Sequence, residues 1–146
     1  MELKELQRLV EAGESETIEF KKSTAQLSRA GETLCAFMNG QGGGVLIGVT
    51  PAGKVIGQQV DDATLREVAA TLDKLEPPAR IRIQRIPLGQ GREVVVLDAP
   101  GSRDSLPFTF GGRAYRRVGS TTSVMPQEEY QRLLLDRAHS RRRWEN

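Results

Sequence analysis

The sequence has a single cysteine, a single histidine and few aromatic residues, and each scarcity excludes a class of site. With Cys35 alone, the chain can form neither an internal disulfide nor a zinc site built from cysteines. A serine or cysteine nucleophile would have to use His139, which lies in a polar stretch, so we assign this histidine no role. An aromatic content of 5% leaves few rings on which nucleic-acid bases could stack.

Long apolar runs and a strong excess of one charge are also missing. No run approaches the length of a membrane span, and the charged start, Met1 to Leu6, lacks the apolar core of a signal peptide. We therefore expect a cytoplasmic protein without a membrane partner. The formal net charge of +2 is too small to indicate a nucleic-acid partner by itself, so the arrangement of the basic residues has to decide.

The length fits a single domain that spans residues 1–146. Because the sequence ends within helical composition, at Trp144 to Asn146, we expect this domain to be the N-terminal part of a longer protein.

The stretch from Leu34 to Gly57 predicts a helix, a glycine-rich turn and a β-hairpin around which the rest of the chain packs. The helix has an apolar face at helical spacing and ends at Asn39-Gly40, since both residues tolerate the left-handed conformation. Val45 to Val49 is a continuous apolar run, which is typical of a central strand covered on both faces. After a turn, Lys54 to Gly57 is expected to pair with it.

Two elements are predicted before this stretch. Apolar residues from Leu3 to Val10 are spaced as in a short amphipathic helix. Glu14 to Ser23 alternates as in a half-buried strand, with Ile18 and Phe20 on the buried face and the charged residues facing solvent. Ser28 is the expected N-cap of the following helix.

Further elements follow the organising stretch. They are a helix capped by Asp61 or Asp62 and ended by Pro77-Pro78, a hairpin of strands 80–86 (Ile81 and Ile83 inward) and 94–97, a hairpin of strands 108–110 and 113–118, and a final helix that starts at Pro126. This order predicts an α+β fold, in which helices pack on one mostly antiparallel, twisted sheet.

The glycine-rich turn, Gln41 to Gly44, could cradle an anion such as ATP with bare backbone amides. A nucleotide-binding loop, however, runs from a strand through the glycines and a Lys-Ser/Thr pair into a helix, whose N-terminus meets the phosphate. Here a helix precedes the glycines and no Lys-Ser/Thr pair follows them. The order favours a structural turn, and ATP binding stays as an alternative.

Glu14 and Glu19 form a candidate metal site, with Lys21 beside them. If Glu14 lies in the loop before the strand, its carboxylate could approach that of Glu19. The two could then hold one divalent cation while Lys21 contacts a phosphate. A solvated, charged strand face would explain the same pattern, so both interpretations stay open.

Basic residues gather in two predicted strands and in the last helix. Such a row fits a surface that follows a nucleic-acid backbone, although surface arginines also serve solubility. The residues are Lys21 and Lys22; Arg113, Arg116 and Arg117; and Arg137, Arg141, Arg142 and Arg143.

Several motifs taken together resemble the Schlafen-type AlbA domain, over about Glu14 to Leu134. They are, in order, Glu14-x4-Glu19-Phe20-Lys21; Cys35-Ala36-Phe37-Met38-Asn39-x-x-Gly42-Gly43; Leu46-Ile47-Gly48-Val49; Gly53-x-Val55-x-Gly57; and Gly112-Arg113-Ala114-Tyr115-x-Arg117-Val118-Gly119-Ser120-Thr121-Thr122. The resemblance implies a DNA-binding or RNA-binding module of a bacterial transcriptional regulator, which needs no cofactor for binding. We expect phosphate contacts from Lys21, Lys22, Arg113, Arg116 and Arg117.

The resemblance also implies a possible nuclease site. In nuclease-active Schlafen members, Mg²⁺- or Mn²⁺-dependent RNA cleavage uses two glutamates and an aspartate just after the Ile-Gly-Val strand. Glu14 and Glu19 match the two glutamates as metal ligands, and Lys21 matches the accompanying lysine, so these are the candidate catalytic residues. Thr50-Pro51 stands at the aspartate position and cannot replace a carboxylate. We favour binding without efficient cleavage and keep the ribonuclease as the alternative.

Animal Schlafen proteins, the resemblance implies, place two related lobes around a basic groove, whereas this chain has one copy of the motif set. A two-fold homodimer is the simplest way to form both walls. The expected contact surfaces are the strand edge near Arg113 to Val118 and the final helix with Tyr130, Leu133 and Leu134. The same leucines could instead pack on the chain's own sheet, and this alternative stays open.

Overall fold

The computed structural model describes residues 1–101 and 106–145, with side chains described up to residue 139. The helices are α1 (Leu3–Ala12), α2 (Leu27–Met38), α3 (Asp62–Leu72) and α4 (Gln127–Glu145), with a short 3-10 turn η1 (Thr24–Gln26) before α2. The strands are β1 (Ile18–Lys21), β2 (Gly42–Ile47), β3 (Leu75–Glu76), β4 (Arg82–Gly89), β5 (Arg92–Pro100), β6 (Thr109–Phe110), β7 (Tyr115–Val118) and β8 (Thr121–Val124).

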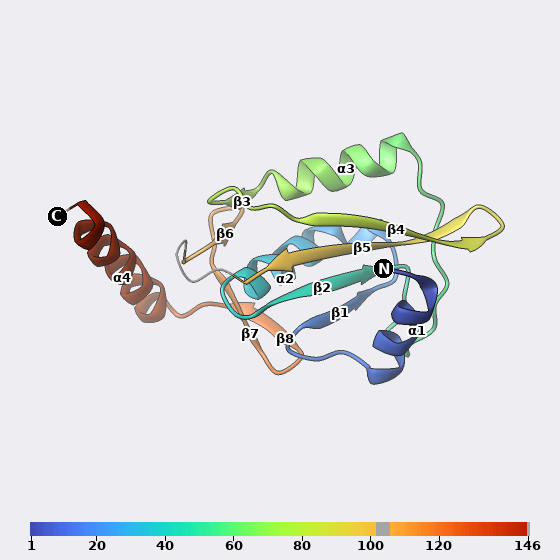
Figure 1. The fold of residues 1–146 in the computed structure, drawn as a ribbon, viewed down its shortest axis with the longest axis horizontal. Coiled ribbons are helices and arrows are strands. Elements are labelled where there is room, and N and C mark those ends of the chain that lie inside the picture. The colour runs from blue at the N-terminus through green and yellow to red at the C-terminus, as the bar shows by residue number, and fades with distance from the viewer. Residues whose placement is uncertain (102–105, 146) are drawn as a thin grey trace.

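A four-stranded sheet in the order β1-β2-β5-β4 forms the centre of the fold (Figure 1). β1 and β2 are parallel, whereas β5 is antiparallel to both β2 and β4. Two small antiparallel sheets, β3-β6 and β7-β8, lie beside it. The predicted α+β fold with a mostly antiparallel sheet is confirmed.

The two faces of the sheet bury separate apolar layers. β2 contributes to both, because successive side chains of a strand point to opposite faces. Val45 and Ile47 pack in the layer that contains α2, and Leu46 packs in the layer that contains Leu6 and Val10 of α1. The prediction that this apolar run lies mid-sheet with both faces covered is therefore confirmed.

The end of α2 is fixed by the side chain of Asn39, which does more than stop the helix. Its Oδ1 accepts a hydrogen bond from Phe108 N at 2.7 Å. Its Nδ2 donates to the carbonyls of Phe108 at 3.0 Å and Tyr115 at 2.8 Å. One amide group thus joins α2 to the segment that leads into β7.

Several local predictions hold. α1 ends at Ala12, where Gly13 follows with a φ of 83°. Asp61 caps α3, because its carboxylate accepts a hydrogen bond from Thr64 N at 2.9 Å. The strands of residues 80–86 and 94–97 form the β4-β5 hairpin. α4 begins directly after Pro126 and projects away from the body of the domain in Figure 1.

The second predicted hairpin is wrong in its pairing. β6 pairs with β3, and β7 pairs with β8 across the tight turn at Gly119, whose φ is 57°. Gly111 and Gly112 do turn the chain, but only a single bridge, Phe110 to Arg113, forms across them. A glycine turn could be recognised from the sequence, whereas the partner of each flanking strand depends on long-range packing.

Several smaller predictions also differ from the structure. The glycines from Gly42 onward belong to β2, and Lys54 to Gly57 forms one bridge, Val49 to Val55, in place of a strand. α2 begins at Leu27, because η1 precedes it and Ser23 caps that turn. α3 ends at Leu72, before Pro77-Pro78, and Leu75 belongs to β3. Ile83, which was expected to face inward, is 40% exposed.

In the described part of the chain, no helix combines the length and the apolar character that a membrane span requires.

We predict that Gly31→Ala destabilises the domain. Alanine would normally favour a helix over glycine by about 1 kcal/mol. A Cβ at Gly31, however, would overlap the ring of Phe110, and overpacking of a core costs about 1 to 3 kcal/mol. The free energy of unfolding, measured by urea denaturation, should therefore fall by about 1 kcal/mol or more.

Gly40→Ala is the matched control, because its Cβ would make only ordinary contacts, and it should change stability by less than about 0.5 kcal/mol. A Gly31→Ala variant as stable as the parent would contradict this packing.

Candidate functional site

Glu19 lies in the interior, on the α2 side of β1. Along β1, Phe20 packs in the layer that contains α1, whereas Glu19 and Lys21 point toward α2. Glu19 is only 8% exposed, so the expected solvent-facing position is wrong. The reason is that α2 and the β7-β8 sheet cover this face of β1, which sequence alternation alone does not reveal.

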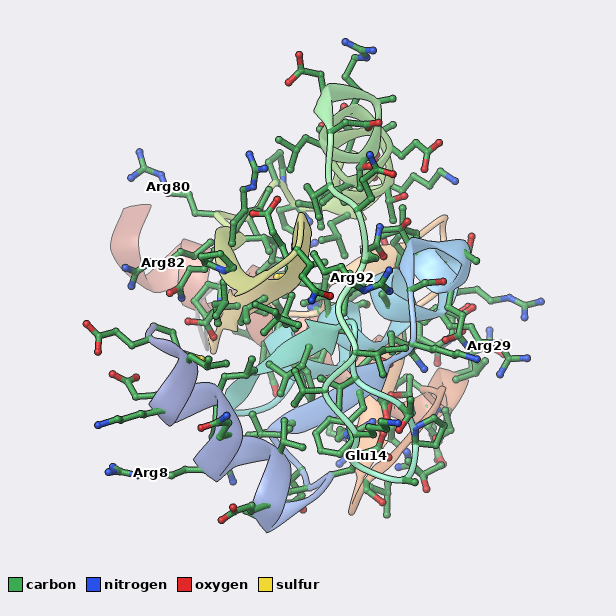
Figure 2. All side chains as sticks on the ribbon, turned by 90° about the vertical axis from the view of Figure 1, so that its right-hand side faces the viewer. Arg8, Glu14, Arg29, Arg80, Arg82 and Arg92 are labelled. Carbon is green, nitrogen blue, oxygen red and sulfur yellow. The ribbon has the colours of Figure 1, made fainter. Side chains whose placement is uncertain are left out.

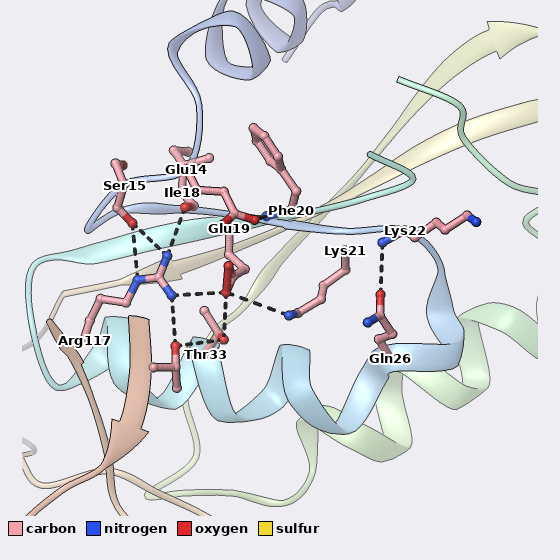
Figure 3. A network of polar contacts seen from close by, with 11 residues as sticks. Glu14, Ser15, Ile18, Glu19, Phe20, Lys21, Lys22, Gln26, Thr33 and Arg117 are labelled. Atoms are coloured by element: carbon pink, nitrogen blue, oxygen red, sulfur yellow. Dashed lines mark hydrogen bonds and ion pairs between the residues drawn. The ribbon is translucent and has the colours of Figure 1, made fainter. Parts of the chain in front are cut away.

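Arg117 of β7 reaches across to β1 and occupies the space beside Glu19 (Figure 3). Its Nη1 donates to Glu19 Oε2 at 3.1 Å, and its Nη2 donates to the carbonyls of Ser15 at 2.8 Å and Ile18 at 3.1 Å. The guanidinium also lies 5.1 Å from the centre of the Phe37 ring. This side chain is 4% exposed, so Arg117 acts as an internal clamp between β7 and the loop before β1.

Two hydroxyl groups and a lysine complete the surroundings of Glu19. Thr33 of α2 lies 3.5 Å from Glu19 Oε2 and 3.0 Å from the hydroxyl of Thr122, which also accepts from Arg117 Nη1 at 3.0 Å. Lys21 Nζ lies 3.8 Å from the same carboxylate oxygen.

Burial raises the pKa of Glu19, and the nearby charge of Glu14 adds to this effect. The positive charges of Lys21 and Arg117 oppose it, but the pKa stays above its ordinary value.

Side chains also close the outer edge of β1. The backbone groups of Ile18, Phe20 and Lys22 point away from β2, since β1 alternates its hydrogen bonds. Arg117 donates to the Ile18 carbonyl, Glu14 Oε1 accepts from Phe20 N at 3.0 Å, and Gln26 Oε1 accepts from Lys22 N at 3.2 Å. Glu14 therefore serves as a backbone cap of this edge.

The residues present do not fit a divalent metal. The Glu19 carboxylate already lies between two cations, and Glu14 accepts from a backbone amide. Thr50, at the position of the expected aspartate, uses its hydroxyl to accept from Lys54 N at 3.0 Å. Within the residues described above, no group of three or more carboxylate, imidazole or thiol side chains is placed to bind a metal ion. The roles of Glu14, Glu19 and Lys21 in cleavage stay predictions.

The basic residues predicted as one set lie in different places. Lys22 is exposed and Lys21 is largely buried against Glu19. Arg113 is exposed in the turn before β7, whereas Arg116 pairs with Glu129 of α4 at 3.0 Å. Arg117 is internal, so its expected exposed position is wrong. The side chains of Arg141 to Arg143 lie outside the described residues.

Sequence analysis gave Thr33 no role, and it named Asn39 and Thr122 without foreseeing the side-chain hydrogen bonds that they make. Thr33, Asn39 and Thr122 carry no charge, and Ser15 contributes only its carbonyl. One signal was available: Thr33 directly precedes the apolar run Leu34 to Met38 of α2 and lies one helical turn from Ala30 and Phe37, where a buried hydroxyl requires a partner. The structure also adds Arg29, an exposed cation one turn before Thr33 on α2.

A family profile described as Schlafen, AlbA_2 matches residues 14–126. No curated protein matches the chain. Among solved structures, the N-terminal domain of a Nitrosomonas europaea protein named as related to the ATP-dependent DNA helicase RecG is similar, with 26% identity and a TM-score of 0.60, over 83% of this chain and 91% of that one.

The DIP2311 protein of Corynebacterium diphtheriae shares the fold, with 14% identity and a TM-score of 0.55 over 81% of this chain. The match covers only 23% of the DIP2311 chain, so it shows a shared fold alone.

We predict that Arg117→Met lowers the free energy of unfolding by about 3 kcal/mol, because it leaves the buried carboxylate of Glu19 with only the more distant Lys21, at 3.8 Å, as a counter-charge. Urea denaturation of the two proteins measures the difference. Arg113→Met removes the same charge from an exposed turn and should change stability by less than about 0.5 kcal/mol. Equal effects of the two substitutions would show that the Arg117 contacts contribute little.

Proposed function

Because this chain belongs to the Schlafen AlbA_2 family, we propose that it is a nucleic-acid-binding domain that contacts the phosphate backbone of DNA or RNA. The proposal includes a place within a bacterial transcriptional regulator. The similarity of this chain to the N-terminal domain of a protein named as related to the DNA helicase RecG supports a nucleic-acid partner. The family and the similar solved structure therefore both favour a nucleic acid as the ligand.

The observation that carries the proposal is a pair of exposed cations at the end of β1 and the start of α2. Gln26, the N-cap of α2, accepts from Lys22 N, and Arg29 lies in the first turn of the same helix. Within the described residues, neither Lys22 nor Arg29 has a carboxylate partner. The N-terminal end of the α2 dipole adds positive potential at this place.

Contacts to phosphates fit this pair better than contacts to base edges. Lysine and arginine without accompanying amide or aromatic side chains position a backbone and carry little sequence information. Lys21 is largely buried against Glu19, and Arg113 is exposed in the turn before β7. We keep both in the proposed contact set, together with Arg116. We leave Arg117 out, because its donors are occupied inside the protein.

Charge reversal of the pair should weaken binding. In the Lys22→Glu/Arg29→Glu double variant we expect affinity for tRNA, single-stranded DNA or duplex DNA to fall by about tenfold or more. The slope of log affinity against log salt should fall by about two, since each lost phosphate contact removes close to one unit. Fluorescence anisotropy in EDTA over a salt series measures both quantities.

The matched control is Lys4→Glu/Arg8→Glu, which makes the same charge change on α1. Both residues are exposed, and Figure 2 shows Arg8 and Arg29 on opposite sides of the domain. If the α1 variant weakens binding as much as the β1-α2 variant, net charge explains the affinity and the proposed surface is wrong.

We also propose a two-fold homodimer through α4 and the β7-β8 edge. α4 has 19 residues and projects from the body, and helices of this length gain most of their stability from packing (Figure 1). Leu133 and Leu134 are half-buried, whereas Leu135 is 62% exposed and Val118 is 57% exposed. A second copy would cover these apolar side chains.

Light scattering at micromolar concentration should report a mass near twice 16.1 kDa. Leu135→Asp should shift this mass toward that of one chain, because it places a charge in the contact. A protein that stays monomeric at these concentrations while it binds nucleic acid tightly would refute the dimer.

A further inference from the structure

The two edges of the central sheet differ in how their backbone groups are satisfied. At β1, three side chains cover the outward-pointing groups, as described above. β4 forms the other edge, and its inner side pairs with β5 over residues 82–87. An edge strand without such covering is a template for a further strand.

The register identifies which groups of β4 are open. Glu93 of β5 exchanges both backbone hydrogen bonds with Gln58 at 2.8 Å, so its groups point away from β4. Its partner Pro87 is therefore in a non-hydrogen-bonded pair, and by alternation so are Arg85 and Ile83. In the described part of the chain, no hydrogen bond reaches the amide or carbonyl of Ile83 or Arg85.

The side chains along this edge have a distinct chemistry on each face. Ile83 is 40% exposed on one face. Arg82 lies on the other face, with Arg80 two residues before it, and neither has an ion pair within the described residues. Arg85 is occupied, because its Nη2 lies 2.8 Å from Glu93 Oε2. Figure 2 shows Arg80 and Arg82 pointing away from the body, on the side opposite Arg29.

We propose that the open edge of β4 binds an extended acidic segment of a partner protein by strand addition. The added strand bonds to the backbone of Ile83 and Arg85. Its carboxylates face Arg80 and Arg82, and its apolar side chains cover Ile83, since alternate residues of a strand point to opposite faces. Pro87 lacks an amide and limits the docking segment to the first half of β4.

Charge decides between this partner and a second copy. Two β4 strands paired with each other would bring Arg80 and Arg82 of both copies to one seam, and like charges across strands are unfavourable. An acidic strand replaces this repulsion by attraction. A nucleic acid could use the arginines, and its phosphates could accept from the open amides. It cannot continue the alternating amides and carbonyls of a strand or cover Ile83 with an apolar side chain.

The probe is a fluorescein-labelled peptide of alternating glutamate and valine, eight residues long. Controls are a lysine-valine repeat of the same length and a peptide with the four glutamates and four valines in blocks. We expect binding of the alternating acidic peptide in anisotropy titrations, with both controls at least about tenfold weaker. Equal binding of the blocked peptide would show that charge alone acts and would overturn strand addition.

Backbone amides provide the second readout. In the free protein, hydrogen exchange at Ile83 and Arg85 should be fast, whereas Gln84 and Ile86, which bond to β5, should be protected. Saturating peptide should slow exchange at Ile83 and Arg85. Unchanged exchange at these two amides in the presence of bound peptide would place the peptide elsewhere and refute the proposal.

Two variants test the charge contacts and the backbone hydrogen bonds separately. Arg80→Glu/Arg82→Glu should weaken the acidic peptide by about tenfold or more. Ile83→Pro removes an outward amide, a change that edge strands tolerate, and should weaken it by about fivefold or more. Circular dichroism confirms the fold of each variant.

Nucleic acid serves as the competing probe. If the arginine variant loses affinity for duplex DNA or tRNA and not for the peptide, the edge is part of a nucleic-acid surface and the peptide proposal is wrong. The proposal does not depend on the function of the Lys22 and Arg29 surface, so either can fail alone.

Discussion

The ion pair between Glu19 and Arg117 is the contact on which the rest of the site depends. Both groups are buried, so each requires the other: a lone charge in this place would cost far more than the pair. Through its other bonds, Arg117 also fixes the loop at Ser15 and the edge of β1 at Ile18. The final hairpin and the first strand, which are distant in the sequence, are thereby locked into one unit.

The structure separates its charged residues into two groups with different tasks. Lys21 and Arg117 neutralise Glu19 inside the domain, whereas Lys22 and Arg29 face solvent without a carboxylate partner within the described residues. The buried ion pairs of Glu19 hold β1 in a fixed position beside α2. The exposed cations at the junction of these two elements are therefore held in a fixed position as well. A rigid scaffold of this kind would hold Lys22 and Arg29 in place for the phosphate contacts proposed above, and it explains why other charged residues of the family motifs are structural.

Patterns within one element were predictable from the sequence, and pairings between elements were not. The apolar run of β2, the cap at Asp61 and the β4-β5 hairpin follow from local periodicity and turn chemistry. The partners of β6 and β7 do not, because the sequence offers glycine turns at both Gly111-Gly112 and Gly119, and either turn could form a hairpin. Glu19 shows the same limit: alternation placed it opposite Phe20, but only the tertiary packing of α2 and β7 determined that its side of the strand is covered.

A double-mutant cycle with Glu19→Gln and Arg117→Met tests the central claim most directly. Unfolding free energies of the four proteins, from urea denaturation, give the coupling between the two residues free of their separate effects. The account predicts a coupling of about 1.5 kcal/mol or more, as for close charge pairs that exclude water. Additive effects, with a coupling within about 0.5 kcal/mol of zero, would contradict it, because the two side chains would then contribute independently.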